Sequence, residues 1–128
     1  MIGHSEVMAT VPVKNLGAAR RFYEQTLGLR LADTEGDEAV IYHSDGSKLL
    51  VYQSAYAGTN QATAVTWAVD DVPAEVKALR AKGVKFEHYD MPGATVKDDV
   101  YDFGSIKNAW CKDPDGNILA IVSRRNQP

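Results

Sequence analysis

Two segments of the chain place apolar residues at helical spacing, and each follows a segment with the alternation of a β-strand. In the first half, residues 7–13 (VMATVPV) predict a strand. Residues 16–27 then show a helical period, with apolar side chains at Leu16, Ala19, Phe22, Tyr23 and Leu27. Asn15 is placed to cap the first turn of this helix, and Gly28 is placed to end it. The pattern predicts a strand followed by a helix of about three turns.

Three further strands are predicted before the middle of the chain. They cover residues 29–35 (LRLADTE), 38–44 (EAVIYHS) and 48–54 (KLLVYQS). Asp45 and Gly46 mark a tight turn between the last two. The residues that follow, AYAGTNQ, have the composition of a linker. The first half is therefore expected to run in the order β-α-β-β-β.

The second half repeats this order with a shift of about 56 residues. The aligned pairs are Val69 with Val13, Asp71 with Asn15, Val72 with Leu16 and, after one deletion, Gly83 with Gly28. Each predicted helix follows a strand and stops at a glycine. The chain is therefore expected to be a tandem duplication of one β-α-β-β-β unit.

The end of the second half is less regular than the end of the first. Residues 85–90 (KFEHYD) predict a short strand, and residues 91–105 (MPGATVKDDVYDFGS) are expected to form a polar loop. A hairpin follows, in which AWCK and ILAIV flank the turn DPDGN. Pro114 and Gly116 suit the backbone angles of such a turn. What the two strands of this hairpin face decides whether it is only a hairpin or part of a site.

Composition places the chain among proteins with one sizeable core: 128 residues, 45% of them hydrophobic, and a net charge of −3. Lysine and arginine form no run or stripe, which argues against nucleic acid or a membrane surface as the main partner. The single cysteine, Cys111, has no intramolecular disulfide partner and is expected to be a small buried hydrophobe. With no long apolar stretch or apolar leader, a cytoplasmic location is expected. A small molecule is the expected partner.

The segments VKNLGAARRFYEQTLGL (residues 13–29) and DPDGNILAIV (residues 113–122) resemble the vicinal-oxygen-chelate superfamily, which includes glyoxalase I, bleomycin-resistance proteins and extradiol dioxygenases. The resemblance covers nearly the whole chain. It implies an α+β fold in which tandem βαβββ modules form curved mixed sheets around a cleft. The modules would span about residues 5–56 and 62–124 of a single domain, 1–128. Members of this length commonly form homodimers, so a homodimer is expected here.

The resemblance also implies where a metal ion would bind. Metal-dependent members use a His or Gln, a Glu, a second His and a second Glu, and these positions fall on Met8, Leu50, Ala64 and Ala120. None of these side chains carries the oxygen or nitrogen donor that a hard divalent ion needs. We expect neither this metal centre nor another cofactor.

Strand alternation predicts instead an apolar cleft with a floor of small residues and walls of aromatic residues. The alanines of the floor would leave room for an aromatic or amphipathic ligand. Trp110 and the tyrosines also suit an ordinary core, so both placements stay open at this point. The candidate ligand-binding residues are Met8, Tyr42, Leu50, Tyr52, Ala64, Thr66, Ala68, Tyr101, Phe103, Trp110 and Ala120.

Two classes of function remain open. The first is a metal-free protein that binds a small molecule, similar to the bleomycin-resistance branch. The second is a glyoxalase- or dioxygenase-like lyase or isomerase that uses a nonstandard metal or acid-base site, for which Glu6, His43 and His88 are the candidate donors. His4, His43 and His88 show no ligand spacing, and a noncatalytic role is expected for each.

Overall fold

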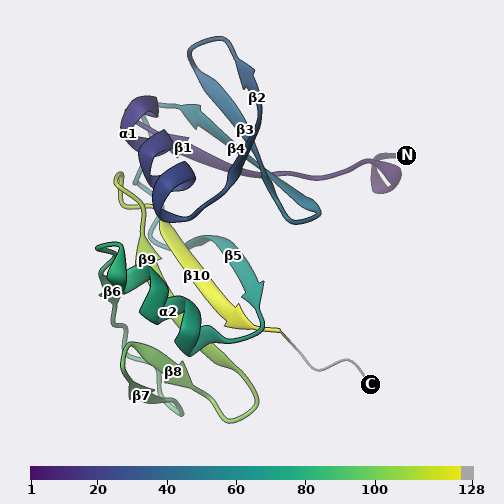
Figure 1. Ribbon diagram of the computed structural model, residues 1–128. Helices are drawn as coiled ribbons and strands as arrows, with labels where there is room; N and C mark the ends of the chain where they lie inside the picture. Colours follow the sequence, from purple (N-terminus) through teal and green to yellow (C-terminus); the bar gives the residue numbers. More distant parts are fainter. Residues whose placement is uncertain (125–128) are drawn as a thin grey trace. The chain divides into compact units, whose positions relative to one another are not determined.

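Each half of the chain forms a sheet with a helix against it, as the repeat predicts (Figure 1). The computed structural model describes residues 1–124, so the last four residues of the predicted domain 1–128 lie outside the described part. Contacts divide the chain into two units. The first contains Met1–Asn60 together with Pro114–Asn117, and the second contains Gln61–Asp113 and the residues from Ile118 onward. The α+β class is confirmed, whereas the module boundaries at 5–56 and 62–124 stay a prediction.

The first unit is built on a four-stranded sheet in the order β1-β4-β3-β2 within residues 1–124. Strands β1 and β4 run parallel, and the other neighbours are antiparallel. Its elements are the 3-10 turn η1 (Ile2–His4), β1 (Ala9–Val13), α1 (Leu16–Arg20), the π-helical segment η2 (Arg21–Thr26), β2 (Arg30–Glu35), β3 (Ala39–Ser44) and β4 (Ser47–Gln53).

The second unit has a mixed sheet in the order β5-β10-β9-β8-β7, and a short strand, β6, pairs with the same edge of β9 as β8 does. Strands β5 and β10 run parallel, with a register shift after Ile118. The elements are β5 (Thr63–Val69), α2 (Val72–Ala81), β6 (Phe86–Glu87), β7 (Thr95–Lys97), β8 (Val100–Asp102), β9 (Lys107–Lys112) and β10 (Ile118–Ser123).

Both helices begin and end as the repeat predicts. The side chains of Asn15 and Asp71 each accept a hydrogen bond from the backbone N–H three residues later, at 2.9 and 3.0 Å. Gly28 and Gly83 follow the helices with φ of 77° and 92°, a region that glycine occupies at no steric cost. Equivalent residues therefore fix equivalent helix ends in the two units.

The first helix differs from the prediction in its second half. It is α-helical only as far as Arg20 and continues as the π-helical segment η2. There the N–H of Leu27 donates to the carbonyl of Phe22, five residues earlier, at 2.9 Å. Tyr23 lies fully buried in this segment. The apolar period of 16–27 predicts helix but does not distinguish an α turn from a π turn.

The predicted loop 91–105 is wrong in part, because it contains the hairpin β7–β8. The turn of this hairpin is formed by Asp98 and Asp99, whose φ values of 51° and 68° are left-handed. Aspartate tolerates this conformation better than most residues, so the acidic pair is a turn signal that the sequence reading missed. The first strand is also shorter than predicted, since β1 begins at Ala9 and Val7 is exposed.

The DPDGN turn between β9 and β10 is fastened within the first unit, to which Pro114–Asn117 belong. The carboxylate of Asp115 accepts a hydrogen bond from the N–H of Lys14 at 3.1 Å. The side-chain amide of Asn117 donates to the carbonyl of Pro12 at 2.8 Å, and Asn117 is almost fully buried. The turn therefore supplies partners for backbone groups at the end of β1.

Gly58 packs directly against this turn and gives a test of it. A Cβ atom at Gly58 would lie 2.0 Å from the carbonyl oxygen of Asp115, and φ is +74°. We expect Gly58→Ala to lower the free energy of unfolding by roughly 3 kcal/mol or more, measured by urea denaturation. Gly36→Ala is the matched control, because Gly36 has φ of +58° and no atom within 4 Å. It should cost only about 1 kcal/mol, and equal costs at both positions would contradict the tight packing.

Candidate functional site

Strand alternation gives the first sheet one buried face and one open face. The buried face lies under α1 and η2 (Figure 1) and consists of Val11, Val13, Val40, Tyr42, Leu49 and Val51. On the open face, β4 presents Leu50 and Tyr52, and Tyr52 is 37% exposed. Met8 directly precedes β1 and is also exposed. Three predicted ligand positions, Met8, Leu50 and Tyr52, are therefore available on this unit.

Tyr42 does not line the open face, and its predicted place in a cleft wall is corrected. It pairs with the buried Leu49, one residue out of phase with Leu50, and so points to the helix side of the sheet. Its ring stacks on Tyr23 with centroids 6.1 Å apart, and its hydroxyl donates to Glu24 at 2.9 Å. Tyr42 is a core residue.

The carboxylate that receives this hydrogen bond is part of an ion pair along the helix. Arg20 Nε donates to the same oxygen of Glu24 at 2.7 Å. The hydrogen bond from Arg20 lowers the pKa of Glu24, while burial and the bond to Glu24 raise the pKa of Tyr42. Both groups therefore keep their ordinary charge states at neutral pH. The cluster fastens η2 to β3 and is not arranged as an acid-base site.

On the second sheet, the face opposite α2 combines a strip of small residues with large rings. Thr66, Ala120 and Trp110 lie side by side on β5, β10 and β9. Thr66 and Ala68 are exposed, and Ala64 is partly buried. The small-residue strip, defined here as Ala64, Thr66 and Ala68, is thus open along the edge strand β5.

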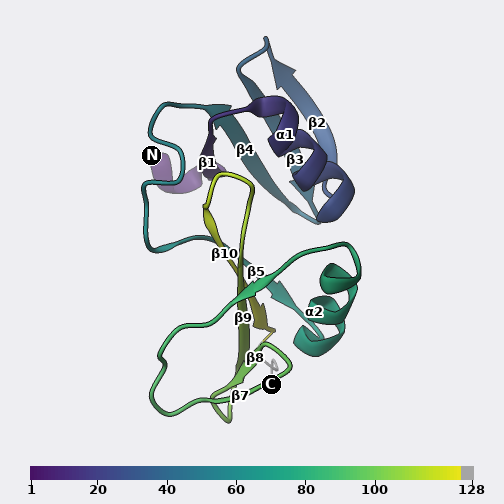
Figure 2. The same cartoon turned by 90° about the vertical axis from the view of Figure 1, so that its left-hand side faces the viewer.

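An aromatic cluster adjoins this strip. We define it as the buried Tyr101, Trp110, Ile118 and Ala120 together with the partly buried Tyr89, Ala94 and Phe103. The ring of Trp110 meets those of Tyr101 and Tyr89 edge to face, with centroids 5.1 and 5.6 Å apart. In Figure 2, α2 lies on one side of this sheet and the segment between β6 and β7 on the other. The structure therefore brings together the predicted residues Tyr101, Phe103, Trp110 and Ala120.

The predicted floor of small residues is open only in part. Ala120 is 3% exposed and Trp110 is 8% exposed, since the rings of the cluster cover this part of the sheet. Ala68 on the neighbouring edge strand remains exposed. Alternation assigned Ala120 to the correct face, but it does not reveal whether another side chain lies over that face. The expectation that Ala120 is an open floor position is corrected.

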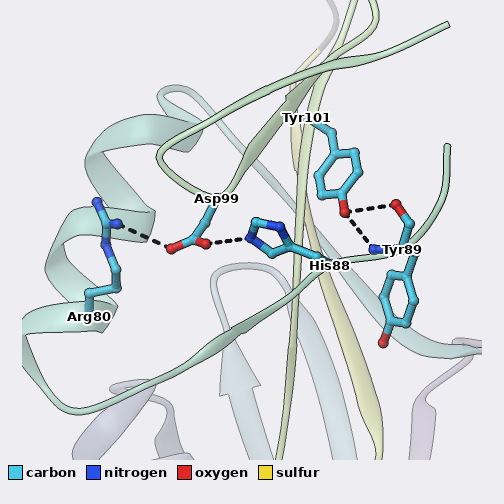
Figure 3. Close-up of polar contacts among 5 residues, drawn as sticks. All are labelled: Arg80, His88, Tyr89, Asp99 and Tyr101. Carbon is cyan, nitrogen blue, oxygen red and sulfur yellow. Dashed lines mark hydrogen bonds and ion pairs between the residues drawn. The ribbon is translucent and has the colours of Figure 1, made fainter. Parts of the chain in front are cut away.

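A polar network holds the segment that passes over the cluster (Figure 3). The hydroxyl of Tyr101 accepts the N–H of Tyr89 at 2.5 Å and donates to the carbonyl of the same residue at 2.9 Å. Next to it, the Asp99 carboxylate binds His88 Nε2 at 2.6 Å and Arg80 at 3.1 Å. The network joins α2, the residues after β6 and the β7–β8 turn.

Sequence reasoning named His88 as a candidate donor but missed its carboxylate partner, Asp99, and also Arg80. Asp99 lies 11 positions after His88 and 19 positions after Arg80 in the sequence. The left-handed turn at Asp99 brings its side chain to both. With Nε2–H donated to Asp99, a neutral His88 would keep Nδ1 as an acceptor. Exposed ion pairs of this kind contribute at most about 1 kcal/mol to the free energy of unfolding. The main effect of the network is therefore to orient the side chains of His88 and Arg80.

Tyr89 is a second residue that the sequence reasoning missed. Its hydroxyl oxygen is buried and finds no hydrogen-bond partner among residues 1–124. Burial raises the pKa of this hydroxyl. A buried hydroxyl without a partner is uncommon in native proteins.

The other candidate donors do not assemble into a metal centre. Within the described residues, no three His, Cys, Asp or Glu side chains lie together in a way that could hold a metal ion. Glu6 is exposed and lies 3.8 Å from Lys48. Met8, Leu50, Ala64 and Ala120 offer no hard donor, so the residues present do not fit the metal that the resemblance implied.

Cys111 is a small buried residue, as predicted. Burial raises the pKa of its thiol to about 11, so the thiolate is scarce at neutral pH. The described part of the chain also contains no helix that is long and apolar enough to cross a membrane.

The sequence matches the family model described as the Glyoxalase/Bleomycin resistance protein/Dioxygenase superfamily over residues 2–121. No curated protein sequence matches the chain. Among solved structures, a glyoxalase family protein from Enterococcus faecalis superposes with a TM-score of 0.72 at 16% identity, covering 95% of this chain and 99% of that one.

Two other solved structures show the same fold. Lactoylglutathione lyase from Agrobacterium tumefaciens has a TM-score of 0.67 and 19% identity, with 93% of each chain covered. TnmS3, an antibiotic binding protein from Streptomyces sp. CB03234, has a TM-score of 0.66 and 21% identity, with 94% of this chain and 97% of that one covered. At these identities the likeness shows the fold alone.

Replacing Ala120 and Ala68 by phenylalanine tests the covered part and the open part of the predicted floor separately. We expect Ala120→Phe to overpack the aromatic cluster and to lower the free energy of unfolding by about 1 to 3 kcal/mol. Ala68→Phe places the same ring on the exposed strip and should change stability by less than about 0.5 kcal/mol. Urea denaturation measures both. An Ala120→Phe variant as stable as the parent would mean that the cluster is not packed over Ala120.

Proposed function

The chain belongs to the glyoxalase/bleomycin resistance protein/dioxygenase superfamily, and within it we propose that this protein binds a small aromatic or amphipathic molecule without a metal ion. The observation that carries the proposal is the aromatic cluster beside the exposed small-residue strip on the second sheet. The proposed ligand lies on Thr66 and Ala68 with one edge against Trp110.

The chemistry of these residues suits a flat apolar molecule. Small side chains on a sheet leave a level surface, and aromatic edges favour stacked or edge-to-face contact with another ring. The cluster contains no charged side chain. TnmS3, a protein of similar fold, is an antibiotic binding protein. It is a precedent for a binding role in this fold and so supports the proposal. On the first unit, taken by itself, Met8, Leu50 and Tyr52 stay proposed ligand-binding residues.

Metal-free binding is proposed from the donor set. A thioether at Met8 and aliphatic side chains at Leu50, Ala64 and Ala120 cannot replace carboxylate and imidazole ligands.

The second candidate function is an acid-base enzyme, and the contact between His88 and Asp99 is the observation that favours it. This arrangement fixes one imidazole nitrogen and would leave the other to accept a proton.

Titration with planar bicyclic aromatic compounds, followed by the fluorescence of Trp110, tests the binding role. We expect a saturable change that is lost in Trp110→Phe, which retains the other tryptophan, Trp67, as a control for signal origin. Ala68→Phe should block the change, since its ring would occupy the strip. A wild-type protein that shows no saturable change would contradict the proposal.

Two further arms of this experiment separate the candidate functions. Prior dialysis against EDTA should leave binding unchanged if no metal takes part. The ligand should also be recovered chemically unchanged after incubation, as judged by its mass. Loss of binding in EDTA, or conversion of the ligand that fails in a His88→Asn variant, would favour the enzyme instead.

We also propose a homodimer. Strand β2 is an edge strand of the first sheet, and all six of its residues are exposed. Unpaired strand edges are surfaces that a second copy can cover. Sedimentation at micromolar concentration should give about twice the chain mass of 14.0 kDa. A monomeric mass would rule out the dimer.

A further inference from the structure

We propose that the Tyr89 hydroxyl is the hydrogen-bond donor that selects ligands at the aromatic cluster, and that these ligands are uncharged planar aromatic molecules with a hydrogen-bond acceptor on the ring edge. The inference rests on the proposed function, because it concerns the same site. It adds the class of ligand and the residue that discriminates it.

The position of the Tyr89 ring is fixed from two sides. Its backbone N–H and carbonyl are both bound by the hydroxyl of Tyr101 (Figure 3), at 2.5 and 2.9 Å. Its ring meets Trp110 edge to face at an interplanar angle of 82°. A donor held in this way is preorganised, so a ligand need not order it on binding.

The hydroxyl of Tyr89 is also unused. It is buried and has no hydrogen-bond partner in the part of the chain that the structure describes. The hydroxyl of Tyr101, the other phenol of the cluster, is already committed to the backbone of Tyr89. Tyr89 is therefore the phenol of the cluster whose O–H is not already donated within the described residues.

The state of this hydroxyl sets the kind of group that it recognises. Burial raises the pKa of Tyr89, so the phenol keeps its proton at neutral pH and acts as a donor. The members of the cluster carry no charge. The charged groups that act on the Tyr89 hydroxyl, Glu87 and Lys112, are paired with each other at 3.5 Å. Asp99 is likewise paired with His88 and Arg80. An uncharged acceptor, such as a ring nitrogen or a carbonyl oxygen, matches this environment better than a charged group, which would lose its hydration without a counter-charge.

Naphthalene and quinoline are matched probes, because they share size and shape and differ by one ring nitrogen that accepts a hydrogen bond. Their affinities for wild-type protein and for Tyr89→Phe are measured by calorimetry at pH 8, where quinoline is uncharged. We expect the ratio of quinoline affinity to naphthalene affinity to fall about fivefold in Tyr89→Phe, the size of one net hydrogen bond. Naphthalene affinity itself should not change.

Tyr56→Phe is the control variant, since Tyr56 is 78% exposed and lies in the first unit. It should leave the ratio as in the wild type. If the wild type binds neither probe, the proposed function fails. If it binds naphthalene and Tyr89→Phe leaves the ratio unchanged, the binding role stands and this inference is overturned. A Tyr89→Phe protein with a lowered thermal midpoint would show that the hydroxyl makes a structural bond, which also overturns the inference.

Discussion

Packing of one helix against one face of each sheet determines which side chains remain for chemistry on the other face. In the first unit, α1 and η2 cover the valines of β1 and β4 and the ring of Tyr42. In the second unit, α2 contacts β8, β9 and β10. Because strand residues alternate between faces, this burial also decides that Leu50 and Tyr52, or Thr66 and Ala68, point the other way. The apolar core and the candidate site are thus two consequences of one strand pattern.

The helix ends were predictable because each depends on a few neighbouring residues. Asn15 and Asp71 act as caps through contacts three residues away, and Gly28 and Gly83 end the helices through their own backbone angles. The β7–β8 hairpin escaped prediction because its turn uses two aspartates in place of the usual asparagine and glycine. Local sequence signals therefore predicted a helix end or a turn where the residues were the common ones for that feature, and failed where they were not.

For the candidate site, the sequence predicted which face of the sheet each residue lies on. It did not predict which of these residues other side chains cover. The sequence placed Tyr101, Trp110 and Ala120 together, and they do lie in one cluster. It did not show that the rings cover Ala120, since that depends on how Tyr89 and Phe103 pack from distant positions. The error at Tyr42 had another origin, because an aromatic residue suits a covered face and an open face equally well. Asp99 gains its significance from partners that the fold brings near, and Tyr89 gains it from a buried hydroxyl that finds no partner among residues 1–124.

The DPDGN turn, which completes the first unit, has a consequence for how the chain acquires its structure during synthesis. Lys14 and Pro12 obtain their hydrogen-bond partners from residues 101 and 105 positions later. A ribosome releases those partners only when almost the whole chain has been made. The first half therefore waits, with its final β1 contacts unmade, until the last hairpin emerges. A fragment that ends at the linker would lack the same contacts, so the first unit is complete only when residues 114–117 have joined it.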